Sequence, residues 1–244
     1  MGADEVLEDA PINRFEEAAE TPPAPVRGPS PAPNANPAPV AALDAAPAST
    51  QLAQAAPDLD ALRSAMAAFE GCALKHGARN LVFSDGQAAA RVMIVGEAPG
   101  REEDRIGKPF VGRSGQLLDA MFAAIGLSRG AEDPTQALYI TNTLPWRPPQ
   151  NRDPSSDEIA LMKPFLLRHI ALADPQVLVL MGNPASKTLL ETTTGITRLR
   201  GTWAEVMGRP ALPMFHPAAL LRDPSKKALA WADLLSLKAK LETL

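Results

Sequence analysis

From residue 58 to the end of the chain, apolar residues recur in two patterns that indicate alternating strands and helices. Short unbroken apolar runs are typical of strands buried on both faces, and four of them lie at 92–95, 138–141, 177–181 and 212–215. Apolar residues spaced three or four apart indicate helices at 59–69, at 116–125, from 155 onward, from 183 onward and at 225–241. Strands that alternate with helices predict an α/β fold of three α/β/α layers with a central four-stranded parallel sheet.

Polar residues and prolines predict where two of these helices begin. Ser155 followed by Glu158 forms a capping box, in which each residue bonds to the backbone of the other. Asn183 followed by Pro184 combines a favoured cap with the proline often found at the first helical position. Pro164 lies inside the predicted helix that follows Ser155, so this helix is expected to be kinked or to start later.

Residues 1–57 differ in composition from the rest and are expected to form a disordered, acidic, Ala/Pro-rich tail. They hold eleven of the 25 prolines and few large apolar residues, so they bury too little surface to offset the entropy of ordering. Eight acids and two bases give this segment a charge of −6, which leaves +2 on the predicted domain at 58–244 from the net charge of −4. A mildly basic domain is compatible with a nucleic-acid partner. Ile12 and Phe15 leave open a role of the tail in binding a protein partner.

The sequence also carries signals of the compartment. No apolar run approaches the ~20 residues that span a bilayer, and the acidic N-terminus lacks the basic and then apolar segments of a signal peptide. A single cysteine, Cys72, excludes an internal disulfide and is typical of a reducing compartment. We therefore expect a cytoplasmic, monomeric protein.

Turns and polar residues follow each predicted strand. The first strand runs into the turn GEAPG at 96–100, the second ends at Asn142, the third at Asn183 and the fourth at His216. Because ligands of open α/β sheets bind beyond the carboxyl ends of the strands, these groups are expected to surround one crevice. Phe110 from the following loop adds an aromatic plane. The set suits a flat, polar, uncharged heterocycle.

The turn at 96–100 does not match a phosphate-binding loop. The dinucleotide fingerprint G-x-G-x-x-G requires a second glycine, and here that residue is Ala98. The P-loop requires a serine or threonine after its lysine, whereas Lys108 is followed by Pro109. A nucleotide-binding module that uses the helix start at Asn183 for phosphate remains an alternative, and the absence of such a loop weighs against it.

Four long motifs, in order, resemble those of the uracil-DNA glycosylase superfamily, nearest its family 4. They are GEAPGREEDRIGKPFVGRSGQLLD at 96–119, YITNTLPWRPPQNRDP at 139–154, LMGNPASKTLL at 180–190 and MFHPAALLRDP at 214–224. The resemblance extends from about Phe69 to Leu241. It implies a DNA repair glycosylase that flips uracil out of DNA, hydrolyses its N-glycosidic bond and leaves an abasic site.

The resemblance implies roles for residues that follow the predicted strands. In that family, backbone groups of the turn at Gly96, Glu97 and Ala98 hold the uracil, and an aromatic at the position of Phe110 stacks on it. An asparagine at the position of Asn142 recognises the edge of the base, and a histidine at the position of His216 faces its carbonyl.

Elementary chemistry agrees with these roles. Cleavage leaves negative charge on uracil O2, and a fixed donor there, such as a neutral His216, lowers the barrier. An asparagine accepts from N3–H and donates to O4, so cytosine would leave buried groups unpaired. Taken singly, each residue also has a structural explanation: His216 before a proline as a cap, Asn142 in a turn, and Phe110 in the core.

The first motif departs from the best-known branch of the superfamily. There the turn carries an aspartate that orients the attacking water, and the residue here is Ala98, as in family 4. Another group must hold the water: Glu97, Glu103, Asn142 or backbone carbonyls, of which the turn with Asn142 is favoured. The candidate catalytic residues are thus His216, Asn142 and Glu97. Glu103 is also a candidate gate that crowds the C5 side of the base, although acids at a helix start are commonly solvated.

Base flipping costs a few kcal/mol, and a wedge with phosphate contacts is expected to offset it. Each candidate arginine has a surface ion pair as its alternative role. The candidate DNA-binding residues are Leu220, Leu221, Arg222, Arg147, Asn151, Arg152, Arg113 and Ser114.

The resemblance also bears on a metal cofactor. Family 4 proteins usually hold a four-iron cluster on four cysteines, and the corresponding positions here are Cys72, Lys75, Trp146 and Met162. Iron–sulfur clusters require several thiolates, so no metal or other cofactor is expected. Lys75, Trp146 and Met162 are expected to pack with Cys72 as an apolar plug.

Two other classes of function remain alternatives. One is a protein that binds uracil or other deaminated or damaged bases in DNA, either without turnover or with broad specificity. The other is covalent trapping of the sugar by a histidine in a basic insert, as in a related branch. The absence of a KRRIH-like insert near RPPQNRDP at 147–154 argues against trapping. Release of free base from a uracil-containing oligonucleotide would separate hydrolysis from binding alone.

Overall fold

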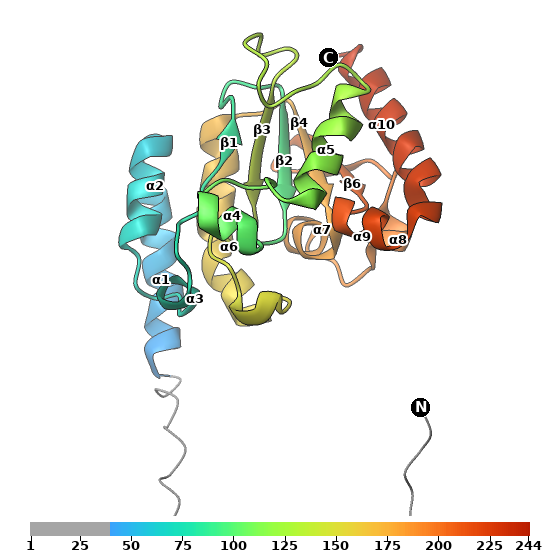
Figure 1. Ribbon diagram of the computed structural model, residues 1–244. Helices are drawn as coiled ribbons and strands as arrows, with labels where there is room; N and C mark the ends of the chain where they lie inside the picture. Colours follow the sequence, from blue (N-terminus) through green and yellow to red (C-terminus); the bar gives the residue numbers. More distant parts are fainter. Residues whose placement is uncertain (1–39) are drawn as a thin grey trace, which may run out of the picture. The chain divides into compact units, whose positions relative to one another are not determined.

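The protein is built on one six-stranded sheet, seen in a computed structural model that describes residues 40–244 (Figure 1). The strand order is β1-β3-β2-β4-β6-β5, in which the four inner strands are parallel and the two edge strands are antiparallel to their neighbours. The strands are β1 (Asp85–Gly86), β2 (Val92–Gly96), β3 (Leu138–Asn142), β4 (Val177–Met181), β5 (Ala204–Val206) and β6 (Arg209–Met214). The predicted α/β fold and its parallel core are confirmed, while β1 and β5 are too short to leave a pattern.

Helices cover both faces of the sheet (Figure 1). On one face, the cluster that includes Ile94, Ile140 and Val179 packs against α5 (Arg113–Ala123) and α10 (Lys227–Leu241). On the other, the cluster that includes Met93, Tyr139 and Leu178 packs against α6 (Ser156–Ala173) and α7 (Gly182–Leu190). The remaining helices are α1 (Val40–Ala55), α2 (Leu59–Ala68), α3 (Leu74–Gly77), α4 (Arg101–Ile106), α8 (Ile196–Leu199), α9 (Pro217–Arg222), and the 3₁₀ turns η2 (Pro149–Asn151) and η3 (Pro224–Lys226). None of the helices in residues 40–244 is both long enough and apolar enough to cross a membrane.

The expectation that residues 1–57 form a disordered tail is wrong for the last part of this segment. Residues Val40–Ala55 form α1, which packs against α6 and buries Ala45 and Ala53. The side chain of Arg168 in α6 fixes the backbone after α1 by donating hydrogen bonds of 3.0 and 2.7 Å to the carbonyl of Ala56. Alanine is the best helix former and permits close helix contact, so a search for large apolar residues missed this helix. Residues 1–39 of the expected tail lie outside the described residues.

The predicted helix starts hold in one case and fail in another. Ser155 caps α6, and Glu158 completes the capping box with a 2.9 Å hydrogen bond from the Ser155 N–H. The helix then continues through Pro164, so it has no later start. Asn183 does not cap α7, which already begins at Gly182; its Oδ1 instead accepts a 2.8 Å hydrogen bond from the N–H of Ile196.

An apolar cluster joins α1, α2 and α3 to α6. Cys72, Trp146 and Met162 all belong to it and are at most 3% exposed. These three residues form the expected apolar plug. The expectation was wrong for Lys75, whose ammonium lies at the surface in an ion pair with Glu70, because a lysine can keep its charge in water at the edge of a core.

A buried histidine of α6 contacts the sheet. His169 is 2% exposed, its Nε2 lies 2.8 Å from the Tyr139 hydroxyl, and its ring stacks on Phe83 with centroids 4.3 Å apart. Burial lowers the pKa of His169 from 6.5 to about 3, because a charged imidazolium would lose its hydration. The folded protein therefore holds this side chain neutral.

We predict that His169 makes the protein sensitive to acid. Below pH 6.5 the imidazole of His169 binds a proton in the unfolded chain, whereas in the folded chain it binds one only below about pH 3. The free energy of unfolding should therefore fall, as pH drops through this window, by up to about 1.4 kcal/mol per pH unit for this group. Urea titrations at several pH values should show a shallower loss for His169→Gln than for the wild type. Parallel pH profiles of the two proteins would contradict the assignment.

Candidate active site

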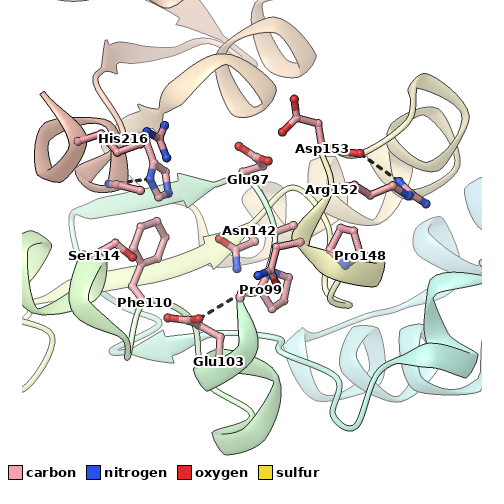
Figure 2. A pocket seen from close by; sticks show the side chains of 15 residues that line it. Glu97, Pro99, Glu103, Phe110, Ser114, Asn142, Pro148, Arg152, Asp153 and His216 are labelled. Carbon is pink, nitrogen blue, oxygen red and sulfur yellow. Dashed lines mark hydrogen bonds between the residues drawn. The ribbon is translucent and has the colours of Figure 1, made fainter. Parts of the chain in front are cut away.

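A cavity of about 410 Å³ opens at the carboxyl ends of the parallel strands (Figure 2). It brings together residues from the ends of β2, β3 and β6, from the loop before α5 and from the segment after β3. Its lining residues are Glu97, Ala98, Pro99, Gly100, Glu103, Phe110, Ser114, Asn142, Pro148, Asn151, Arg152, Asp153, His216, Ala218 and Arg222. The crevice expected from the strand ends is thus present, except that Asn183 does not line it.

The turn after β2 is fixed to the end of β3. The N–H and the hydroxyl of Thr143 each donate a 2.9 Å hydrogen bond to the carbonyl of Gly96, and the N–H of Leu144 donates to that of Glu97 at 3.0 Å. Parallel pairing sets Gly96 beside Asn142. A Cβ at Gly96 would lie 2.4 Å from Asn142 Oδ1 and 2.5 Å from Phe110 Cε2. Only glycine therefore lets these two side chains approach the turn.

Phe110 lines the cavity in an unfavourable backbone conformation. Its φ is +52°, in the left-handed region, which costs a residue with a Cβ on the order of 1–2 kcal/mol. The residue is 4% exposed, and its ring stacks against that of His216, with centroids 5.2 Å apart and planes inclined by 29° (Figure 2). Gly115 passes so close beneath that a Cβ there would lie 1.8 Å from the Phe110 carbonyl oxygen.

His216 lies two residues beyond the end of β6 and caps α9. Its Nδ1 accepts a 3.1 Å hydrogen bond from the N–H of Ala218, so the proton of the neutral ring is on Nε2. The pKa of His216 is lowered to about 4, chiefly by burial and also by the positive charge of Arg222, while Glu103 opposes both effects. The site therefore contains a neutral imidazole with one N–H donor. Gly182 leaves room for it, since a Cβ there would lie 3.1 Å from the His216 Cβ.

Two carboxylates of the cavity differ in their surroundings. Burial raises the pKa of Glu97, the negative charge of Asp153 raises it further, and Arg222 opposes them. Glu103 instead accepts backbone hydrogen bonds from Gly100 at 3.1 Å, Val111 at 3.0 Å and Gly112 at 2.9 Å. The alternative that Glu103 is a solvated acid at a helix start is therefore wrong. Glu103 is 8% exposed, and its hydrogen bonds connect α4 to the loop that carries Phe110.

The expected DNA-binding residues are only partly grouped around the cavity. Arg222, Ser114, Asn151 and Arg152 line it, while Leu221 is 39% exposed nearby on α9. Leu220 was wrongly expected to be available as a wedge: it is 1% exposed and packs with Phe215 and Ala230. The direction of a side chain from a six-residue helix follows from packing, which the sequence alone does not give.

Two of the arginines are held by neighbours. Arg152 donates hydrogen bonds of 2.9 and 2.6 Å to the Glu158 carboxylate, so the surface ion pair considered as its alternative role is present. Arg147 donates through Nε at 2.7 Å to Asn151 Oδ1. Arg113 opens α5 and is not among the lining residues of the cavity.

Sequence reasoning missed several lining residues. Asp153 and Pro148 belong to the motif at 139–154 but were not singled out, because an acid or a proline in a loop carries no spacing signal. Pro99 and Ala218 flank residues that were identified. The proximity of Asp153 to Glu97 comes only from the folded chain.

Comparisons with known proteins agree with this arrangement. A family model described as the uracil DNA glycosylase superfamily matches residues 83–235. A type-4 uracil-DNA glycosylase of Thermotoga maritima is 38% identical over 158 residues, which are 64% of this chain and 79% of that protein. Proteins of the same name are 41% identical in Archaeoglobus fulgidus (63% of this chain, 78% of that protein) and 35% identical in Saccharolobus solfataricus (76% and 88%). The chain therefore belongs to the uracil DNA glycosylase superfamily, with type-4 proteins among its relatives.

Proposed function

We propose that this protein is a uracil-DNA glycosylase that hydrolyses the bond between uracil and deoxyribose in DNA and leaves an abasic site. The observation that carries the proposal is the neutral His216, which lines the same cavity as Asn142 and Phe110 and does not use its Nε2–H in the helix cap. The names of the type-4 relatives support it.

His216 supplies the principal stabilisation of the leaving base. Departure of uracil places negative charge on its O2, and a preorganised donor at that oxygen lowers the barrier. Because Nδ1 accepts from Ala218, the donor at Nε2 is fixed before substrate arrives. The low pKa of His216, about 4, keeps the ring neutral near pH 7. The site therefore acts as a hydrogen-bond donor, with no proton transfer required.

Asn142 and Phe110 recognise the flipped base. The Asn142 amide accepts from uracil N3–H and donates to O4, and cytosine would leave both groups unpaired. The Phe110 ring stacks on the base without distinguishing its edge. Backbone groups of Gly96, Glu97 and Ala98 complete the pocket from the turn that is fixed to β3.

The two glutamates have separate proposed roles. Glu97 helps to hold the attacking water with Asn142 and the turn, since the pKa of Glu97 is raised by burial and by Asp153, a property common in catalytic carboxyls. Glu103 is the gate: its carboxylate is held by three backbone N–H groups and lines the cavity. A fixed carboxylate at the C5 side would exclude the methyl group of thymine.

The DNA strand lies over the mouth of the cavity. Leu221 fills the gap that the flipped base leaves, in place of the buried Leu220. Phosphate contacts come from four arginines and two smaller donors, of which only Arg113 and Arg147 lie outside the lining of the cavity. They are Arg222, Arg147, Arg152, Arg113, Asn151 and Ser114. We further propose that the enzyme acts as a cytoplasmic monomer.

The residues present do not fit an iron–sulfur cluster. Of the four positions that bear cysteines in family 4, only Cys72 has a thiol. Trp146 and Met162 are buried in the same apolar cluster as Cys72. Residues 40–244 also hold no group of three or more His, Cys, Asp and Glu side chains that could bind a metal ion. No step of the proposed reaction passes through a metal.

We predict that the purified protein contains no stoichiometric iron and lacks the broad visible absorbance of an iron–sulfur protein. The reason is that a lone thiolate does not hold such a cluster. Elemental analysis after anaerobic purification tests this. Cys72→Ala, which removes the only thiol, should leave uracil excision unchanged; brown protein whose colour and iron disappear with Cys72→Ala would overturn the prediction.

A second prediction concerns the three base-contacting side chains. His216→Ala should slow single-turnover excision of uracil by about 10²–10³-fold, the loss expected for one such donor. Asn142→Asp should lower excision and weaken discrimination against cytosine, because a carboxylate cannot donate to O4. Phe110→Ala should weaken binding of every base alike. Alkaline cleavage of uracil-containing and cytosine-containing duplexes measures the changes in excision, and inhibition by free bases measures the change in binding.

Two outcomes would change the conclusion. A wild type that binds uracil-DNA selectively and releases no base would favour the alternative of a damaged-base binding protein. His216→Ala at the wild-type rate would refute the proposed role of the imidazole. A lesion panel with hypoxanthine, xanthine and ethenocytosine would then define the substrate range.

A third prediction tests the close approach at Gly96. Gly96→Ala places a Cβ where Asn142 Oδ1 and the Phe110 ring now lie, so excision should fall at least about tenfold, equivalent to ~1.4 kcal/mol of barrier. Gly77→Ala is the matched control, since a Cβ there meets nothing within 4 Å. If both variants excise uracil equally well, the steric constraint at Gly96 does not matter for activity.

A further inference from the structure

Outside the cavity, one arginine contacts the backbone of the loop that carries Phe110. Arg129 Nη2 donates to the carbonyl of Phe110 at 2.9 Å, and Nη1 donates to the carbonyl of Pro109 at 3.0 Å. A single guanidinium therefore holds two consecutive carbonyls beside a residue at φ +52°. The bonds involve backbone groups, so no pattern in the sequence pointed to them.

Arg129 is itself held rigidly. Its Nε donates to Asp119 of α5 at 2.8 Å, and its Nη1 lies 3.1 Å from Asp85 of the edge strand β1. Its side chain is 16% exposed. Burial raises the pKa of Asp85, but hydrogen bonds from Lys108 and Arg129 outweigh that effect, so the pKa of Asp85 lies below its ordinary value. The arginine thus has carboxylate partners on two elements and aims its remaining donors at the loop.

The other side of the same loop is held by Glu103. Its carboxylate accepts from the N–H groups of Val111 and Gly112, which directly follow Phe110. The backbone of Phe110 is therefore fixed by donors on one side and by an acceptor on the other. This arrangement explains how a phenylalanine persists in a conformation that L residues rarely adopt.

We propose that Arg129 is a positioning residue for base recognition: its guanidinium holds Phe110 in the left-handed conformation that keeps the ring in the cavity. The two-residue strand β1 then has a function as well, because it supplies Asp85 to orient the guanidinium. A lysine could pair with the carboxylates but could not donate in parallel to two successive carbonyls. This inference rests on the proposed function of Phe110 as the stacking surface.

The test compares Arg129→Lys with Arg209→Lys in the full-length protein. Arg209 is a matched control, because it is 19% exposed, bonds to a carboxylate and a carbonyl, and does not line the cavity. Arg129→Lys should raise the inhibition constant of free uracil about tenfold, within the range of a lost stacking contact. Affinity for undamaged duplex should stay unchanged in both variants.

A double mutant separates positioning from general destabilisation. If Arg129 acts only through the ring, Arg129→Lys should have no further effect on uracil inhibition or excision in a Phe110→Ala background. An equal loss in both backgrounds would overturn the proposal. Asp85→Asn should produce a smaller loss in the same direction, and it serves in place of Arg129→Lys if that variant does not fold.

A direct structural readout distinguishes this proposal from the proposed function. The crystal structure of Arg129→Lys should show residue 110 outside the left-handed region or its ring displaced from His216. That result would support the positioning role even if the wild type excised no uracil, in which case the glycosylase proposal alone would fail. An unmoved Phe110 in the variant would refute the positioning role whatever the activity.

Discussion

The parallel pairing of β2 with β3 is the constraint on which the rest of the site depends. It places Gly96 opposite Asn142, and hydrogen bonds from Thr143 and Leu144 then fix the turn that follows. The absence of a side chain at Gly96 admits both the Asn142 amide and the Phe110 ring into the same small volume. A shift of one residue in this register would turn every side chain of the shifted strand to the other face of the sheet and would disperse the site.

The loop around Phe110 shows how strain is maintained at such a site. The left-handed backbone of Phe110 would relax in isolation, and hydrogen bonds from Arg129 and to Glu103 oppose that relaxation. Both interactions are formed within the chain, so the ring is held in the cavity before any ligand binds. Preorganisation of this kind lowers the entropy that binding must overcome, and it matches the neutral, single-tautomer state of His216.

The parts that could be predicted from sequence are those governed by local pattern. The four parallel strands follow from unbroken apolar runs, and Asn142 and His216 follow from their places at strand ends. The edge strands, the helix at Val40–Ala55 and the burial of Leu220 depend on packing partners distant in sequence. The same holds for Asp153 beside Glu97 and for Arg129 beneath Phe110, whose contacts are formed only when the chain is folded.

The cap that His216 provides for α9 would link DNA binding to chemistry at the base. The same ring nitrogen that sets the tautomer also accepts the N–H of Ala218 at the start of the helix bearing Leu221 and Arg222. A proton added to Nδ1 would replace this acceptor with a donor and turn the contact from attractive to repulsive. Acid would then loosen the segment that we propose to face the DNA strand in the same event that charges the imidazole. Protonation of His216 would then weaken DNA binding and chemistry at the base together.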